Sequence, residues 1–283
     1  MTRIRPRLGT WLIVAWAGLL VGAGPAAGQG LNFSNPDSAV PIEVTADDGI
    51  EWQQEKQLFL ARGNARATRG EVAVNSDLLR AFYRKKAEGG TDIYRLEAVG
   101  AVRIVSAGET AFGENAVYDV DKGIMVLSGK EVKLVAAEDT ITADQQLEYY
   151  DAKQMAVARG HAVAQRADRK IRTDVLVAYF QRDAAGKSRV YRVDAFDNVH
   201  ITTAQEQVWA DRGVYNVDSA IATLSGNVKL VRGENTLVGC SAEVNLKTGI
   251  SKLKSCEGQG RGVRGLLKAD ETPGLKNRTP GTK

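Results

Sequence analysis

The sequence repeats itself with a period of 97 residues. Residues 58–84 align without a gap on residues 155–181. The segment VYDVDKGIMVLSGKEVKL at 117–134 returns as VYNVDSAIATLSGNVKL at 214–230, one residue shorter after Glu131. In a β-strand, one extra residue would turn every later side chain to the opposite face. We therefore expect a turn or a β-bulge near Glu131 to absorb it.

Short segments within each repeat alternate apolar and polar residues. They are AVRIV at 101–105, EVKLV at 131–135, NVHIT at 198–202 and NVKLV at 227–231. Their alternating apolar positions are Val102, Ile104, Val132, Leu134, Val199, Ile201, Val228 and Leu230. A period of two is typical of a strand with one buried face, whereas no sustained 3.6-residue stripe follows the N-terminal segment. The pattern predicts an all-β protein.

A shorter period lies inside the long one. Similar segments are predicted to start at Gly63, Gly100, Gly129, Gly160, Asp197 and Gly226, which are 29 to 37 residues apart. Each unit of about 30 residues predicts two strands, roughly 14 to 16 strands in all. Such units bury their apolar faces by stacking on their neighbours. We therefore predict one elongated β-domain over residues 29–260.

The two ends differ from this body. Residues 1–28 carry Arg3, Arg5 and Arg7, then an apolar run and small residues, which predicts a cleaved signal peptide; an uncleaved anchor is the alternative. Residues 261–283 carry a net charge of +4 and predict a basic disordered tail, or one that contacts anionic lipid or a partner. The body is left with a net charge of about −3, which gives no indication of nucleic-acid binding.

Few residues offer reactive chemistry. Cys240 and Cys256 are the only cysteines, and an exported chain favours a disulfide between them over two buried thiols. His161 and His200 are too few for a metal site, and no nucleophile has a base nearby in a known motif. We predict neither a cofactor nor an enzymatic activity.

Several segments in order resemble one known family. They are PIEVTAD at 41–47, RGNARATRGEVAVNSDLLRAFY at 62–83, GENAVYDVDKGIMVLSGKEVKL at 113–134 and ITADQQLEYYDAKQMAVARG at 141–160. Together they resemble the LptA/OstA family of periplasmic lipopolysaccharide-transport proteins, over residues 41–256. The resemblance implies a folded-over antiparallel sheet, a β-jellyroll or β-taco, whose apolar interior holds acyl chains of lipopolysaccharide. It also implies head-to-tail association, and contacts through edge strands with inner- and outer-membrane transport proteins.

The resemblance adds Ile42 and Val44 to the candidate groove-lining residues, because they match the first strand of the family. The eight alternating residues named above complete this set of ten. The same ten residues would equally fill a closed core. A structural envelope scaffold without a lipid ligand is therefore the second hypothesis, and a β-solenoid enzyme acting on polysaccharide is the third. Relative to the family the chain is long, because its second half largely repeats its first.

Overall fold

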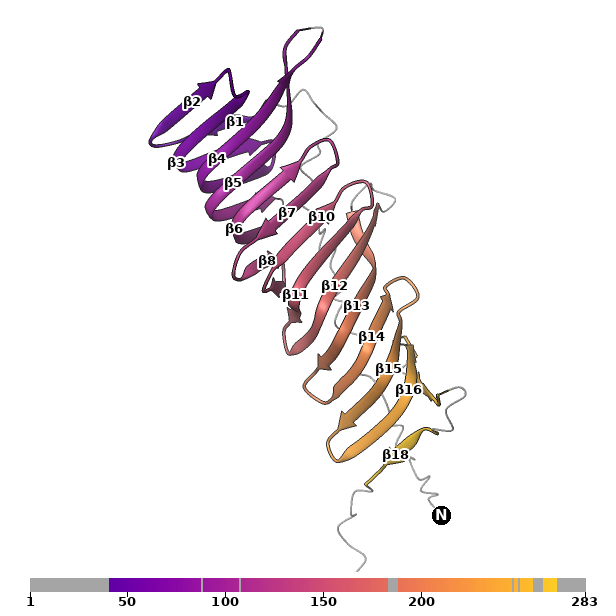
Figure 1. Cartoon of the computed structure of the whole chain (residues 1–283). Coiled ribbons are helices and arrows are strands. Elements are labelled where there is room, and N and C mark those ends of the chain that lie inside the picture. The colour runs from indigo at the N-terminus through magenta and orange to yellow at the C-terminus, as the bar shows by residue number, and fades with distance from the viewer. Residues whose placement is uncertain are drawn as a thin grey trace, which may run out of the picture.

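The chain folds into one long antiparallel β-sheet, whose strands stack from β2 at one end to β18 at the other (Figure 1). The structure, a computed structural model, describes residues 41–87, 89–106, 108–182, 188–245, 247–248, 250–256 and 262–268. Within these residues the sheet has 18 strands. They are β1 (Glu43–Thr45), β2 (Gly49–Gln53), β3 (Leu58–Arg69), β4 (Val72–Lys85), β5 (Thr91–Ser106), β6 (Glu109–Asp119), β7 (Ile124–Ser128), β8 (Val132–Ala136), β9 (Asp139–Ala143), β10 (Gln146–Tyr150), β11 (Met155–Arg166), β12 (Arg169–Arg182), β13 (Ser188–Thr202), β14 (Gln207–Asn216), β15 (Ile221–Arg232), β16 (Asn235–Asn245), β17 (Ile250–Lys254) and β18 (Arg264–Leu266). The prediction of an elongated all-β protein is confirmed.

The sheet is folded over along its length, because its long strands bend near their middle. In β15, for example, residues 221–225 pair with residues 241–245 of β16, and residues 228–232 pair with residues 235–239 after a register shift. One half of each long strand belongs to one side of the folded sheet, which is called arm A here and includes β2, β7, β10 and β17. The other half belongs to arm B, which includes β1, β8, β9 and β18. The line of bends between the two arms is called the corner.

Stacked along the sheet, the 18 strands form 14 layers, where a layer is either one long strand or two short strands that together run through both arms. Ten strands run unbroken through the corner, and four further layers are split there into the pairs β1 with β2, β7 with β8, β9 with β10, and β17 with β18. At about 4.8 Å between neighbouring strands, 14 layers span roughly 60 Å. The two strands predicted in each unit of about 30 residues therefore correspond to two bent layers of the sheet.

Residues at the corner adopt left-handed backbone conformations in successive pairs. These pairs are Gly63 with Asn64, Gly100 with Ala101, Gly160 with His161, Asp197 with Asn198, and Gly226 with Asn227. At Gly226, φ is 76° and an added Cβ would lie 2.1 Å from Asp211 Oδ2, so a side chain does not fit. The predicted segment starts at these positions are wrong, because the residues lie inside strands, where a β-bulge bends the strand at a residue that tolerates positive φ. The further predicted start, Gly129, lies between β7 and β8.

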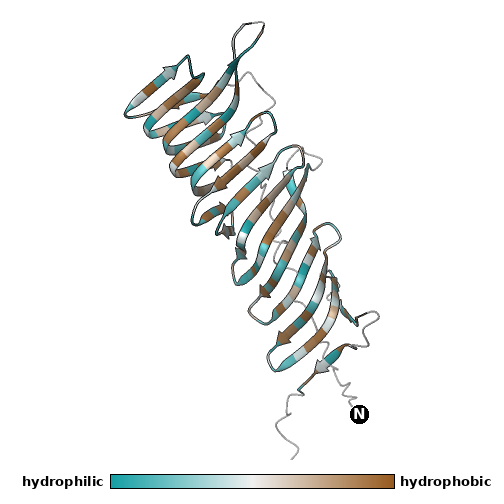
Figure 2. Ribbon diagram, in the orientation of Figure 1, coloured by the Kyte–Doolittle hydropathy of each residue, from teal (hydrophilic) through white to brown (hydrophobic). Residues whose placement is uncertain are grey.

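Side chains alternate between the interior and the outer surface along both arms, as the alternating brown and teal ribbons of Figure 2 show. In β5, Val102 and Ile104 are each 1% exposed, while Arg103 between them is exposed. Cross-strand pairing aligns these positions into rows that run along the whole sheet. The inner rows of the two arms face one another and form the hydrophobic core.

The extra residue of the first repeat lies at the corner. Residues 129–131 separate β7 from β8, whereas the matching β15 is continuous. Val132 and Val228, which follow the two corners, are both 0% exposed. The extra residue is therefore absorbed in the bend at residues 129–131, near Glu131 as predicted, and both repeats bury the same face.

The sheet extends beyond the predicted end of the β-domain. The tail was predicted to be disordered from residue 261, but Arg264–Leu266 forms β18 and pairs with residues 236–238 of β16. The reason is that β17 covers only the arm A half of β16, which leaves backbone groups of its arm B half free to pair. The predicted signal peptide and the rest of the tail lie outside the described residues.

Candidate functional site

A cavity of about 370 Å³ lies between the two arms at the β1–β2 end of the sheet. Its lining residues are Ile42, Val44, Ile50, Phe59, Leu60, Ala61, Ala67, Val74, Leu79, Arg80, Ala81, Ile93, Leu96, Glu97, Ala98, Ile104, Ala116, Val117, Tyr118 and Met125. Tyr118 and the ion-paired Arg80 and Glu97, whose charged atoms lie 3.3 Å apart on the outer surface of arm A, are the polar residues of this set; the other lining residues are apolar. Ligand pockets typically have volumes of roughly 300–1,000 Å³, so the cavity has room for part of an apolar ligand.

Three of the ten predicted groove residues line this cavity: Ile42, Val44 and Ile104. The other seven pack into or against the hydrophobic core: Val102, Val132, Leu134, Val199, Ile201, Val228 and Leu230. Phe59, Leu79 and Leu96 also line the cavity but were not predicted. The alternation of Leu96 and Ala98 around Glu97 was the available signal.

The cavity lies in the first repeat, and at two inner positions of arm B the second repeat carries the larger side chain. Val74 on β4 corresponds to Ile171 on β12, and Ala111 on β6 corresponds to Val208 on β14. Val208 is 1% exposed, and Ile171 packs against the core cluster. These two positions of arm B therefore project more side-chain volume toward arm A in the second repeat.

The cavity ends where the closed core begins. Tyr118 and Met125 line it and also belong to the core cluster, together with Tyr149 on β10. The Tyr118 hydroxyl donates a hydrogen bond to Asp151 Oδ2 at 3.2 Å. This group of large side chains closes the cavity toward the second repeat.

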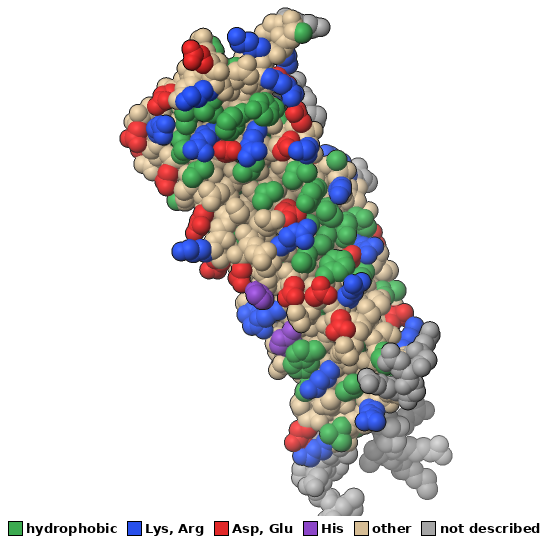
Figure 3. All heavy atoms as spheres, in the orientation of Figure 1, with side chains coloured by type: hydrophobic (Ala, Val, Ile, Leu, Met, Phe, Trp, Pro, Cys, Tyr) green, Lys and Arg blue, Asp and Glu red, His purple; other side chains and the backbone are tan. Residues whose placement is uncertain are grey.

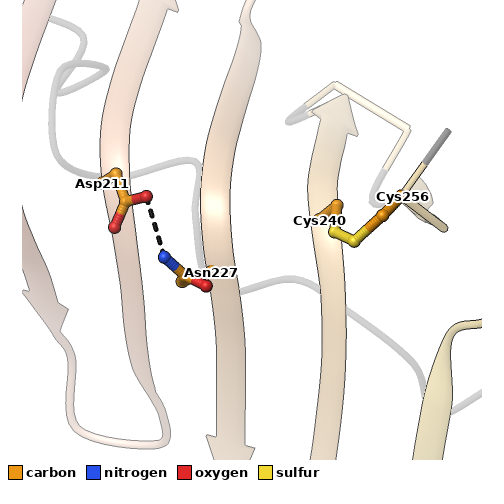
Figure 4. The surroundings of a disulfide bond; sticks show 4 residues. All are labelled: Asp211, Asn227, Cys240 and Cys256. Atoms are coloured by element: carbon orange, nitrogen blue, oxygen red, sulfur yellow. Dashed lines mark hydrogen bonds between the residues drawn. A yellow bond between two sulfur atoms is a disulfide. The ribbon is translucent and has the colours of Figure 1, made fainter. Parts of the chain in front are cut away.

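Pairs of polar side chains connect neighbouring layers along the corner. Asn64 donates to Asp47 at 2.7 Å, Asn198 donates to Asp174 at 2.8 Å, and Asn227 donates to Asp211 at 3.0 Å. After the last of these pairs, Cys240 on β16 is joined to Cys256 by a disulfide, with Cα atoms 5.1 Å apart (Figure 4). Cys256 follows β17, so the disulfide fastens the last layer to β16.

Two matching glutamates lie at the free margin of arm B with different partners. Glu206 is buried, and Arg232 Nη2 lies 2.6 Å from its Oε2. The matching Glu109 is 8% exposed, and the residue in the place of Arg232 is Ala136, with which Glu109 is paired across strands. Without a basic neighbour, burial raises the pKa of the Glu109 carboxyl to about 7.

The two ends of the sheet expose apolar side chains and carry opposite charges. At the first layer, Ile50 and Trp52 are 54% and 57% exposed, and at the last layer Ile250 and Leu266 are 55% and 69% exposed. Exposed acidic residues of the first layer are Glu43 and Glu51, and exposed basic residues of the last layer are Lys252, Lys254 and Arg264. Edge strands leave backbone groups unpaired, so each end can extend the sheet of a partner.

The described residues contain no group of three or more His, Cys, Asp or Glu side chains that could hold a metal ion. They also contain no helix with the length and hydrophobicity that crossing a bilayer requires. Fold and site together define a class of protein: a folded-over β-sheet with an apolar cavity between its arms and open edges at both ends.

The family follows from comparison with known proteins. Residues 43–145 and 140–250 each match the family model described as LptA/(LptD N-terminal domain) LPS transport protein. The chain belongs to this family, as the sequence motifs predicted, and its two matches coincide with its two repeats. The family is one of lipopolysaccharide-transport proteins and not of enzymes.

Two individual relatives have low identity to the chain. An uncharacterised protein of Rhizobium meliloti (strain 1021) is 26% identical over 121 residues, which are 41% of this chain and 63% of that protein. The chain thus spans less than two thirds of the length of this relative. The crystal structure of LptH, the LptA-homologous periplasmic component of the lipopolysaccharide transport device from Pseudomonas aeruginosa, aligns with 82% of this chain and 99% of its own. That alignment has 10% sequence identity and a TM-score of 0.21.

Proposed function

We propose that this protein carries lipopolysaccharide across the periplasm and that acyl chains enter the cavity between β1 and β7. The observation that supports this most directly is the apolar lining of that cavity. Burying about ten methylene groups of an acyl chain contributes roughly 8 kcal/mol before the entropic cost of binding. The sugars and phosphates of the same molecule would remain in water outside the two arms.

Lipid contact is proposed first for Ile42, Val44 and Ile104, the predicted groove residues that line the cavity. Contact at the seven predicted residues of the closed core requires the arms to separate. A closed-core scaffold remains the second candidate, because these core positions are well packed. The cavity favours transport over the scaffold.

We further propose that the protein forms part of a bridge by adding its end strands to other sheets of the transport system. The first and last layers run in opposite directions, so a second copy can continue the antiparallel sheet head to tail. Continuing the rows of paired residues would place Lys252 of one copy beside Glu51 of the next, and Leu253 beside Ile50. The opposite charges and the apolar row both favour this docking. Inner- and outer-membrane partners would use the same two edges.

Photo-crosslinking in living cells tests the proposal. A photoreactive residue replaces Ile42 or Leu96 in the cavity, Ile201 in the closed core, or Thr110 on the outer surface, and adducts are blotted for lipopolysaccharide. We expect adducts from Ile42 and Leu96 and none from Thr110. An adduct from Ile201 would extend the groove into the second repeat. Exported, folded protein without adducts at Ile42 and Leu96 would support the scaffold instead.

A further inference from the structure

The outer surface of arm B carries a continuous row of basic side chains. Cross-strand pairing places one residue of each layer in this row, which is called the basic row. Its members are Thr45, Arg66, Asn75, Arg103, Phe112, Lys133, Thr142, Val163, Arg172, His200, Trp209, Lys229, Val238 and Arg264. The row holds six lysines or arginines, one histidine and no acidic residue.

These six cations form no ion pair with any described residue. Arg66 donates one hydrogen bond to Asn75 at 3.0 Å, which leaves its charge unbalanced. The outer surface of arm A is different, because five of its arginines pair with acidic residues on the same surface. Those pairs are Arg62 with Glu51, Arg80 and Arg95 with Glu97, Arg159 with Glu148, and Arg192 with Asp194. Neighbouring acidic and basic side chains of this kind are visible in Figure 3.

Both repeats place an aromatic ring between two basic residues of the row. In the second repeat, Trp209 stacks on His200 with ring centroids 4.8 Å apart, and Lys229 Nζ lies 5.3 Å from the centroid of the Trp209 ring. In the first repeat, Phe112 is 38% exposed and lies between Arg103 and Lys133. A solvent-facing aromatic residue on a sheet gains nothing from core packing, yet this position is aromatic in both repeats.

We propose that the basic row binds a linear anionic polysaccharide, distinct from the lipid between the arms. Basic residues lie mostly in alternate layers, about 10 Å apart, along roughly 60 Å of sheet. One line of charges matches a one-dimensional polyanion, whereas a bilayer surface would contact a broad patch. Arginine and lysine pair with carboxylate or phosphate groups, and the aromatic rings offer flat apolar faces to sugar rings.

The row beside it fits the same ligand. Moving toward the free margin of arm B, the next outward row contains the hydroxyls of Thr68, Thr110, Thr140, Thr202 and Thr236. These hydroxyls both donate and accept hydrogen bonds, as sugar hydroxyls do. The same row also contains Gln165, Gln207 and Lys170, and Glu43 at its first layer. Hydroxyl groups therefore lie beside the charged line at five of its layers.

The test uses the purified, lipid-free chain, so its outcome does not depend on lipopolysaccharide binding. Polygalacturonate oligomers of 4, 8 and 12 sugars serve as the probe, titrated by calorimetry at 50 and 300 mM salt. One variant combines Arg103→Gln, Lys133→Gln and Arg172→Gln in the basic row. The control combines Lys56→Gln, Lys85→Gln and Lys86→Gln, which lie on arm A or its turns and remove the same net charge.

We expect affinity to rise with oligomer length and to fall at high salt. The variant of the basic row should bind the longest oligomer at least tenfold more weakly, and the control should change less than twofold. Equal weakening in both variants would overturn the proposal, since it would show a net-charge effect. Absence of binding would also overturn the proposal. Preferential binding of the basic row to vesicles containing 30% phosphatidylglycerol would overturn it as well. Circular dichroism and elution volume confirm that both variants are folded.

Discussion

Replacing Glu109 by glutamine should stabilise the protein at neutral pH and remove one part of its pH dependence. The carboxyl is 8% exposed, lies opposite Ala136 and has no basic partner. Its pKa is raised from 4.5 to about 7 by burial. At 1.36 kcal/mol per pKa unit, this difference corresponds to about 3 kcal/mol.

The direction of this pH dependence follows from whether the folded or the unfolded state holds the proton of Glu109. Between pH 4.5 and 7 the folded protein keeps the proton on Glu109, whereas the unfolded chain releases it. The stabilising contribution is therefore complete below pH 4.5 and is lost as the pH rises through 7. At pH 8 the buried carboxylate destabilises the folded state by about 3 kcal/mol, and a neutral amide avoids most of that cost.

The assay is urea unfolding at pH 5 and pH 8, followed by circular dichroism. We expect Glu109→Gln to raise the urea midpoint at pH 8 and to change it little at pH 5. Glu206→Gln is the matched control and should lower the midpoint at both pH values, because it removes the partner of Arg232. If the wild-type chain and Glu109→Gln lose stability equally between pH 5 and pH 8, the reasoning about Glu109 is refuted.

Three further predictions concern the corner and the ends. Gly226→Ala should lower the free energy of unfolding by about 2 kcal/mol, because a Cβ meets Asp211 at positive φ; unchanged thermal stability would contradict this. Reducing the disulfide of Cys240, which spans a separation of 16 residues, should cost about 3 kcal/mol and increase hydrogen exchange in β17, so unaltered exchange there would argue against its fastening role. Lys252→Glu should weaken head-to-tail association in analytical ultracentrifugation, and adding Glu51→Lys on the partner copy should restore it. Association unaffected by either change would exclude this docking geometry.

The sequence was sufficient to predict the class of fold, because the side-chain period of a strand is visible in residues such as Val102, Arg103 and Ile104. The sequence was also sufficient to detect the duplication, since matching residues are separated by a fixed number of positions along the chain. The folded-over form of the sheet was implied by the family resemblance, but the positions of the bends within the strands were not predicted. A glycine in a turn between strands and a glycine in a bulge inside a strand have the same local signal, and only cross-strand pairing distinguishes them.

Only part of the cavity lining could be predicted: Ile42, Val44 and Ile104. Ile42 and Val44 belong to a recognisable first-strand motif, but the extent of the cavity depends on volumes that meet across the two arms. The difference between Ala111 and Val208 matters only once β6 and β14 are known to face arm A. Alternation identifies inward-facing residues, but it does not show whether the opposite arm leaves space beside them.

The layered construction also sets how the length of such a protein can change. The 97-residue period spans six layers, from β3 to β11, which is three whole hairpins. Because six is even, the duplication lengthened the sheet without reversing the direction of its last strand. An insertion of one layer would make both end strands run the same way and would spoil antiparallel addition at one end. Proteins of this design are therefore expected to lengthen or shorten by whole hairpins, each worth about 10 Å of reach.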